Sequence, residues 1–203
     1  MLKYFLTLCF LCSCAHLSPT QVFLKTPRAF DGTKESFYLV HGHSKILSHT
    51  EKVSLAAWIK PNRVQNVEII AVGAANKTEM STSRACLKIN EKNGLQVYAR
   101  STDAQDPRWY ISTEKNNLFS LNTWTHIAAI IHFDNNKIEF FVNGNKVLTE
   151  NKLIKFAQSQ TPMTPSHLIA IGSEENNSGQ NFSGLITHVV ISNKVLDIKK
   201  LPG

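Results

Sequence analysis

The chain has 203 residues, of which 42% are hydrophobic and 18% are charged, an ordinary composition for a folded globular protein. That length fits one domain, or one domain with an export segment, and is short for two independent domains. No apolar run reaches the roughly 18 residues that a membrane-spanning helix needs, so the composition excludes a body that crosses a bilayer by helices.

The formal net charge is +7, from 22 Lys and Arg residues against 15 Asp and Glu residues. The basic residues are mostly single lysines, and only Lys199 and Lys200 are adjacent. Nucleic-acid-binding tails carry blocks of like charge, and the sequence has none, so no nucleic-acid partner is predicted. We interpret the surplus as a solvated surface, with attraction to anionic polysaccharide or lipid head groups as the alternative.

The first 20 residues have the pattern of an export signal and a short tether. Lys3 supplies a positive start and residues 4–11 are largely apolar, but the stretch is too short to span a bilayer. Residues 11–14, Leu-Cys-Ser-Cys, resemble the bacterial lipobox, although Cys12 is an unusual occupant. The resemblance implies a lipid on Cys14 and a protein anchored to a membrane of the cell envelope, with residues 21–203 as the folded domain. A cleaved signal followed by secretion is the alternative.

The body of the chain repeats short β-branched and aromatic runs separated by Asn, Gly, Asp, Ser and Pro, which predicts strands rather than helices. Residues 53–59 are apolar on both faces of the expected pleat, so this strand should be buried, with Trp58 as a core anchor. Trp124, at the start of another apolar run, is also expected in the core. The other expected strands are 67–72, 85–89, 95–99, 124–131, 137–142, 168–172 and 184–192.

Two Asn-Gly pairs predict tight turns. Asn93-Gly94 closes a five-residue link between strands 85–89 and 95–99, and Asn143-Gly144 follows strand 137–142. About eight strands without a covering helix must pack sheet on sheet, which predicts an all-β protein with a two-sheet antiparallel β-sandwich of the jelly-roll type. Cys86, the only cysteine beyond residue 14, is expected to be buried and inert rather than reactive.

A polar loop between expected strands carries the candidate ligand-binding residues Asp106, Arg108, Trp109 and Tyr110. Sugars are held by an aromatic face against the ring together with planar polar groups on the hydroxyls, and this segment supplies both. The alternative is that Trp109 and Tyr110 begin the next strand and pack inward.

Several segments, in this order, resemble the laminin-G-like jelly-roll modules of the concanavalin A-like lectin and glucanase superfamily, over about residues 30–196. The matching segments are 30–32, 55–61, 121–128, 138–144, 169–172 and 182–186. The resemblance implies a concanavalin A-like sandwich. The family usually continues the last of these segments with an acidic pair, where this sequence has Thr187 and His188. Asp31 is the one candidate calcium ligand, and Ca²⁺ takes about six to eight oxygens. No metal is therefore predicted.

The superfamily also includes glycosidases, which need two carboxylates about 5 Å apart, or wider, across the bond that they cleave. No expected strand repeats Asp or Glu at even spacing, and Glu139 stands alone among apolar residues. His41, His43 and His49 suggest zinc only weakly, because no further ligand is evident. His126 and His188 are interpreted as hydrogen-bonded structural residues.

The sequence therefore predicts a non-enzymatic binding module without a cofactor, exported and lipid-anchored, whose partner is a carbohydrate or another envelope or extracellular protein. Two alternatives stay open. One is a structural or assembly lipoprotein of the envelope, and the other is a divergent glycoside hydrolase.

Overall fold

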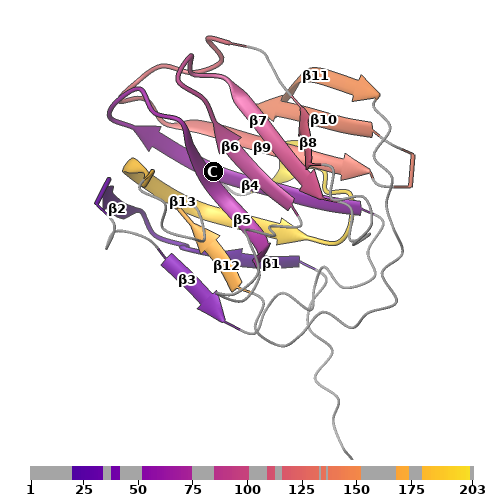
Figure 1. Cartoon of the computed structure of the whole chain (residues 1–203), viewed down its shortest axis with the longest axis horizontal. Helices are drawn as coiled ribbons and strands as arrows, with labels where there is room; N and C mark the ends of the chain where they lie inside the picture. The colour runs from indigo at the N-terminus through magenta and orange to yellow at the C-terminus, as the bar shows by residue number, and fades with distance from the viewer. Residues whose placement is uncertain are drawn as a thin grey trace, which may run out of the picture.

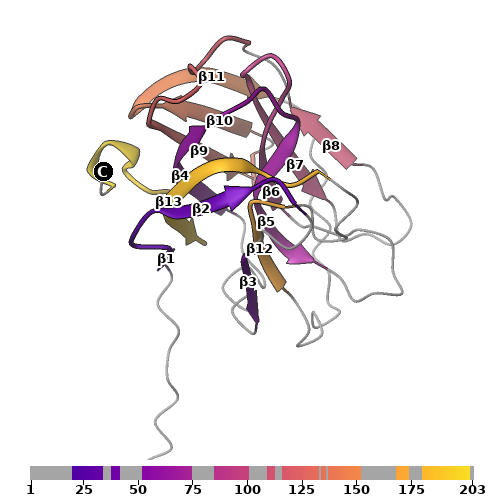
Figure 2. The same ribbon diagram turned by 90° about the vertical axis from the view of Figure 1, so that its left-hand side faces the viewer.

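The computed structural model describes residues 20–33, 38–41, 52–74, 85–100, 109–112, 116–132, 134–135, 137–151, 168–173 and 180–201. Within these ranges thirteen strands form two sheets, and every strand pairing is antiparallel. The sheets lie face to face, as two views of the ribbon show (Figure 1 and Figure 2). The prediction of an all-β, two-sheet antiparallel sandwich is confirmed.

The seven-stranded sheet holds the longest strands of the protein. Its order is β1 (Thr20–Phe23), β13 (Ser183–Ser192), β4 (Lys52–Pro61), β9 (Thr125–His132), β10 (Lys137–Val142) and β11 (Asn145–Asn151), and β2 (Arg28–Asp31) also pairs with β13. The last strand in the chain therefore lies beside strands from its beginning, so residues far apart in the sequence meet on this sheet.

The six-stranded sheet faces it. Its order is β3 (Tyr38–His41), β12 (Leu168–Ile171), β5 (Val67–Ala74), β6 (Ala85–Ile89), β7 (Leu95–Arg100) and β8 (Trp109–Ser112). The β6–β7 hairpin forms as predicted, with β7 one residue longer than the expected 95–99, and Asn93 adopts a positive φ of 53° in the link. The side-chain oxygen of Asn90, at the start of the link, accepts hydrogen bonds from the N–H groups of Lys92 and Gly94.

Each of the eight predicted strands is present, and the structure adds β1, β2, β3, β8 and β11. Four of the added strands have only four residues each, too few for a clear alternation of apolar and polar side chains. The fifth, β11, has the sequence NKVLTEN, which is mostly polar and lacks the apolar alternation by which a strand is predicted. It forms because the Asn143-Gly144 turn returns the chain along β10.

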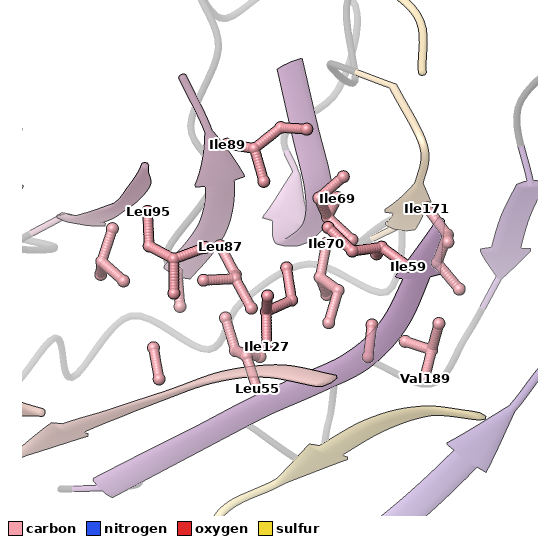
Figure 3. Close-up of a cluster of buried hydrophobic side chains, with 14 of the residues drawn as sticks. Leu55, Ile59, Ile69, Ile70, Leu87, Ile89, Leu95, Ile127, Ile171 and Val189 are labelled. Atoms are coloured by element: carbon pink, nitrogen blue, oxygen red, sulfur yellow. The ribbon is translucent and has the colours of Figure 1, made fainter. Parts of the chain in front are cut away.

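The core lies between the sheets and is built by strand alternation (Figure 3). In β4, Leu55, Ala57 and Ile59 are fully buried members of this core. They face residues such as Ile70 and Leu87 of the six-stranded sheet. Cys86 is also fully buried, as predicted.

The outer face of the seven-stranded sheet, away from the six-stranded sheet, has a second and smaller apolar cluster. Ala56, Ala128, Ile130 and Val190 of the sheet are covered there by Ile198, with Leu196 and Leu201 packed against them. Ile198 belongs to a short 3₁₀ turn, η2 (Ile198–Lys200), and Figure 2 shows this C-terminal end beyond the seven-stranded sheet. In the part of the chain that the structure describes, no helix is both long and apolar enough to cross a membrane.

Candidate functional site

The predicted ligand-binding residues fall at the limit of what the structure describes. Asp106 and Arg108 lie outside the described residues, as does Cys14. Trp109 and Tyr110 open β8, where they pair with Arg100 and Ala99 of β7. A binding site at this loop stays a prediction.

The prediction that Trp58 and Trp124 are core residues is wrong. Trp58 follows Ala57 and precedes Ile59, both core residues, so strand alternation places it on the outer face with Ala56. Trp124 comes directly before β9, and both tryptophans are half-buried. Two indoles therefore lie at the protein surface, where their apolar rings are not required for the core.

Residues at one level of the outer face form a row across three strands and a turn. Thr187 of β13 pairs with Trp58 of β4, and Trp58 pairs with His126 of β9. The turn residue Asn143 stands next to His126. Thr187 directs its hydroxyl to the carbonyl oxygen of Leu24, at 2.8 Å.

A pocket of ≈ 390 Å³ opens at this row. Its lining consists of Trp58, Trp124, His126, Asn143, Gly144, Ile198, Lys199 and Leu201, and we name it the tryptophan pocket. Its volume lies within the range of small-molecule sites, which are mostly apolar with a few placed polar groups. The walls come from four separate parts of the sequence, so only the folded chain forms it.

His126 forms the floor of the pocket as a neutral imidazole. Its ring lies 5.3 Å from the Trp58 ring, centroid to centroid, and the planes are inclined by 42°. The side chain is buried, and this burial lowers the pKa of His126 from 6.5 to about 4. At neutral pH the imidazole is therefore uncharged and presents one donor and one acceptor nitrogen.

Asn143 and Gly144 hold the rim of the pocket in place. Both have positive φ, 48° and 77°, which is the backbone of the two-residue turn that Asn-Gly predicts. The N–H of Asn143 donates to the carbonyl oxygen of His126 at 2.8 Å, and the side-chain oxygen of Asn143 accepts the N–H of His126 at 2.9 Å. These two bonds fix the turn to β9 beside the imidazole.

Glu139 has charged partners in the fold, although its neighbours in the sequence are apolar. Its side chain is buried on the outer face and accepts hydrogen bonds from Lys146 and from the Nε2 atom of His132, the latter at 2.9 Å. The Nζ atom of Lys137 lies 3.4 Å from the same carboxylate oxygen as His132. Burial raises the pKa of the Glu139 carboxyl, but these hydrogen bonds and the lysine charges outweigh it, so the net pKa lies below its ordinary value. Glu139 is an ionised member of a structural charge cluster, which suits neither a general acid nor a partner in a carboxylate pair.

The described residues that were considered for metals have other partners or lie apart from further ligands. Asp31 uses one carboxylate oxygen to accept hydrogen bonds from the N–H and the hydroxyl of Thr33. His41 ends β3, whereas His43 and His49 lie outside the described residues. Within the described ranges, no group of three or more His, Cys, Asp or Glu residues could hold a metal ion. His188 sits in a bulge of β13 with φ of 46° and its Nδ1 atom lies 3.1 Å from the Thr187 hydroxyl, as expected for a structural histidine.

The two facing antiparallel sheets define a concanavalin A-like β-sandwich protein. The chain belongs to the concanavalin A-like lectin/glucanases superfamily, through the Laminin_G_3 family, which matches residues 31–200. This confirms the family that the sequence motifs indicated. The comparison with curated proteins finds no match.

Solved structures share the fold at low sequence identity. The CBM40 module of the Ruminococcus gnavus IT-sialidase, bound to α2,3-sialyllactose, has a TM-score of 0.62 and 16% identity, over 90% of this chain and 95% of that one. The leech intramolecular trans-sialidase has a TM-score of 0.63 and 14% identity, over 89% of this chain but 27% of the enzyme. A pentraxin of Limulus polyphemus has a TM-score of 0.57 and 13% identity, over 86% of this chain and 79% of that one. At these identities the likeness shows the fold alone.

Proposed function

We propose that this protein is a non-enzymatic carbohydrate-binding module, exported and held at a membrane of the cell envelope, which binds a sugar ring in the tryptophan pocket. The observation that carries the proposal is the position of Trp58 and Trp124, both at the outer surface and both in the lining of one pocket. Large apolar rings left outside a core mark binding surfaces more often than structural ones when polar groups converge beside them.

The lining suits a sugar because it offers both kinds of contact that a pyranose needs. An indole face covers the apolar C–H surface of the ring, and burial of that surface favours binding. The imidazole of His126 and the amide of Asn143 are polar groups beside the indoles, able to exchange hydrogen bonds with hydroxyls. Neither group carries a net charge, so sugar hydroxyls can replace water there at little electrostatic cost.

The chemistry of the same lining favours binding over hydrolysis. Glycoside hydrolysis needs two carboxyl groups flanking the bond, and none of the eight lining residues carries a carboxyl side chain. The buried Glu139 belongs to a different part of the face, with its oxygens held by Lys146 and His132. The R. gnavus module with this fold, which binds sialyllactose, adds support for a carbohydrate ligand.

The test is a glycan-binding screen of the full chain, followed by the affinity of each hit for the variants Trp58→Ala and Trp124→Ala. We expect each variant to weaken binding at least tenfold, about 1.4 kcal/mol, because truncation removes a ring that contacts the sugar. Far-UV circular dichroism should stay unchanged, since neither indole lies in the core.

The matched controls are Arg108→Ala and Trp109→Ala, which alter the loop that the sequence predicted as the site. Binding that survives both pocket variants but is lost with the loop variants would move the site to residues 100–110. A screen without any glycan ligand, with a fixed protein partner recovered instead, would favour the assembly role.

The anchor at Cys14 is the second part of the proposal, and it concerns where the module acts. A single acyl chain binds a bilayer only marginally, at ~0.8 kcal/mol per buried CH₂, whereas a diacylated cysteine holds durably. We expect metabolic labelling with a palmitate analogue to mark the wild-type protein and to leave Cys14→Ala unmarked. An unlabelled wild-type protein recovered from the medium would replace the anchor with secretion.

A further inference from the structure

The charge of the tryptophan pocket comes from a single side chain. Lys199 is exposed on η2 and lines the pocket, and the other lining residues are uncharged at neutral pH. His126 does not add a second cation, because its burial keeps the imidazole neutral. The pocket therefore has an apolar aromatic wall, neutral polar groups and one positive group.

The position of Lys199 follows from the fold of the C-terminal segment. Ile198 packs into the outer apolar cluster, which fixes η2 against the sheet. The stem of Lys199 then lies over the turn at Gly144, where a Cβ atom would be 3.6 Å from its Cγ and 3.8 Å from its Cα. The lysine thus belongs to the pocket wall, and its ammonium group is the charged group that the lining carries.

The adjacent lysine is arranged differently. Lys200 forms an ion pair with Asp197, with 3.2 Å between Nζ and the carboxylate oxygen, and it does not line the pocket. The two lysines share the same short turn and the same net charge, yet only one of them belongs to the pocket. This pair separates the effect of a charge in the pocket from the effect of charge on the protein as a whole.

We propose that the tryptophan pocket selects a sugar that carries a ring carboxylate, such as a uronic acid, with Lys199 as the specificity-determining residue. The proposal rests on the proposed function and names the ligand class of the same site. Stacking on the indoles orients the ring, and the lysine ammonium then pairs with the carboxylate at the mouth of the pocket. Because low-dielectric walls surround one side of the pair, water screens it less than a pair on an open surface.

The same lining disfavours the other ligands that aromatic pockets bind. Quaternary ammonium groups bind between aromatic rings, usually where no cation competes. Lys199 would repel such a ligand, and no carboxyl side chain in the lining would offset that repulsion. A neutral sugar would bind through the indoles but would leave the ammonium group without a partner from the ligand.

The experiment compares oligogalacturonate with its fully methyl-esterified form, which keeps the sugar backbone but lacks the charge, on the full chain. We expect the acid to bind wild type about fivefold more tightly at low salt, a gain of the size measured for partly exposed ion pairs. Lys199→Gln should abolish the preference by bringing the affinity for the acid down to that for the ester. Lys200→Gln should preserve the preference.

Four outcomes would overturn the inference. The first is equal binding of acid and ester to wild type, and the second is an equal loss in Lys199→Gln and Lys200→Gln, which would indicate general attraction to a basic protein. The third is a preference for the acid that survives Trp58→Ala, which would place it outside the pocket. If a neutral glycan binds in a Trp58-dependent way while the acid does not, the proposed function stands and this inference alone fails.

Discussion

Gly184→Ala is expected to lower the free energy of unfolding by about 3 kcal/mol or more, enough to leave little folded protein in a domain of ordinary stability. Gly184 lies in β13 with φ of 143°, a conformation that side chains rarely adopt. A Cβ atom there would collide with the carbonyl oxygen of Lys60 and lie 2.9 Å from the Cα of Pro61. Both are backbone atoms of β4, so no side-chain rotation can relieve the contact.

The position of Gly184 in the sheet explains why the neighbours cannot yield. It pairs with Pro61 of β4 on one side and with Phe30 of β2 on the other. Moving β4 away would separate it from β13, and Ile59, two residues before Pro61, is fully buried in the core. The strain must therefore appear as lost stability rather than as a local shift.

Chemical denaturation followed by tryptophan fluorescence measures the effect, with Gly144→Ala as the control. Gly144 also has positive φ, 77°, but its added Cβ would meet Lys199 only at 3.6 Å, an ordinary contact. The control should lose about 1 kcal/mol from backbone strain alone. Similar losses in both variants would show that contact with β4 contributes nothing.

Much of the sandwich could be predicted because its signals are local. Residues 85–89 and 95–99 alternate around a link containing Asn93, and the structure forms this hairpin with its second strand one residue longer. The Asn143-Gly144 turn follows from the ability of both residues to adopt positive φ. Such signals depend on a few neighbouring residues, so the rest of the chain seldom overrides them.

The face taken by Trp58 could not be predicted, because β4 is apolar on both sides. Ala56 and Trp58 look as suited to a core as Leu55 and Ala57 do. What distinguishes the faces is the C-terminal segment, whose Ile198 covers Ala56 from a distance of more than a hundred residues in sequence. An apolar residue beneath such a cover cannot be told from a core residue by alternation alone.

The tryptophan pocket could not be predicted for a related reason. It joins β4, the start of β9, the β10–β11 turn and η2, which no spacing in the sequence brings together. Asn143 was predicted only as a turn residue, and Lys199 only as half of an adjacent charge pair. The spacing of Leu196, Ile198 and Leu201 was the one available sign that the C-terminal segment packs on the sheet. The sequence instead indicates the loop of residues 100–110, because aromatic, charged and amide groups are contiguous there.

Leu55→Ala and Trp58→Ala, three residues apart on β4, are expected to differ in both stability and binding. Leu55 is fully buried between the sheets, so its truncation leaves a cavity and should lower the free energy of unfolding by about 3 to 5 kcal/mol. Trp58 is half-buried on the outer face and contacts His126, so its loss should cost only about 1 to 2 kcal/mol despite its larger ring. Urea denaturation followed by far-UV circular dichroism measures both without relying on the deleted fluorophore.

The two variants should exchange ranks when sugar affinity is measured. Leu55→Ala keeps the lining of the tryptophan pocket, so the fraction that remains folded should bind with wild-type affinity, whereas Trp58→Ala removes one wall. A side chain that stabilises the fold and a side chain that binds ligand are thereby separated on one strand. If Trp58→Ala instead costs as much stability as Leu55→Ala, the indole contributes to the core after all, and its place in a binding pocket has to be abandoned.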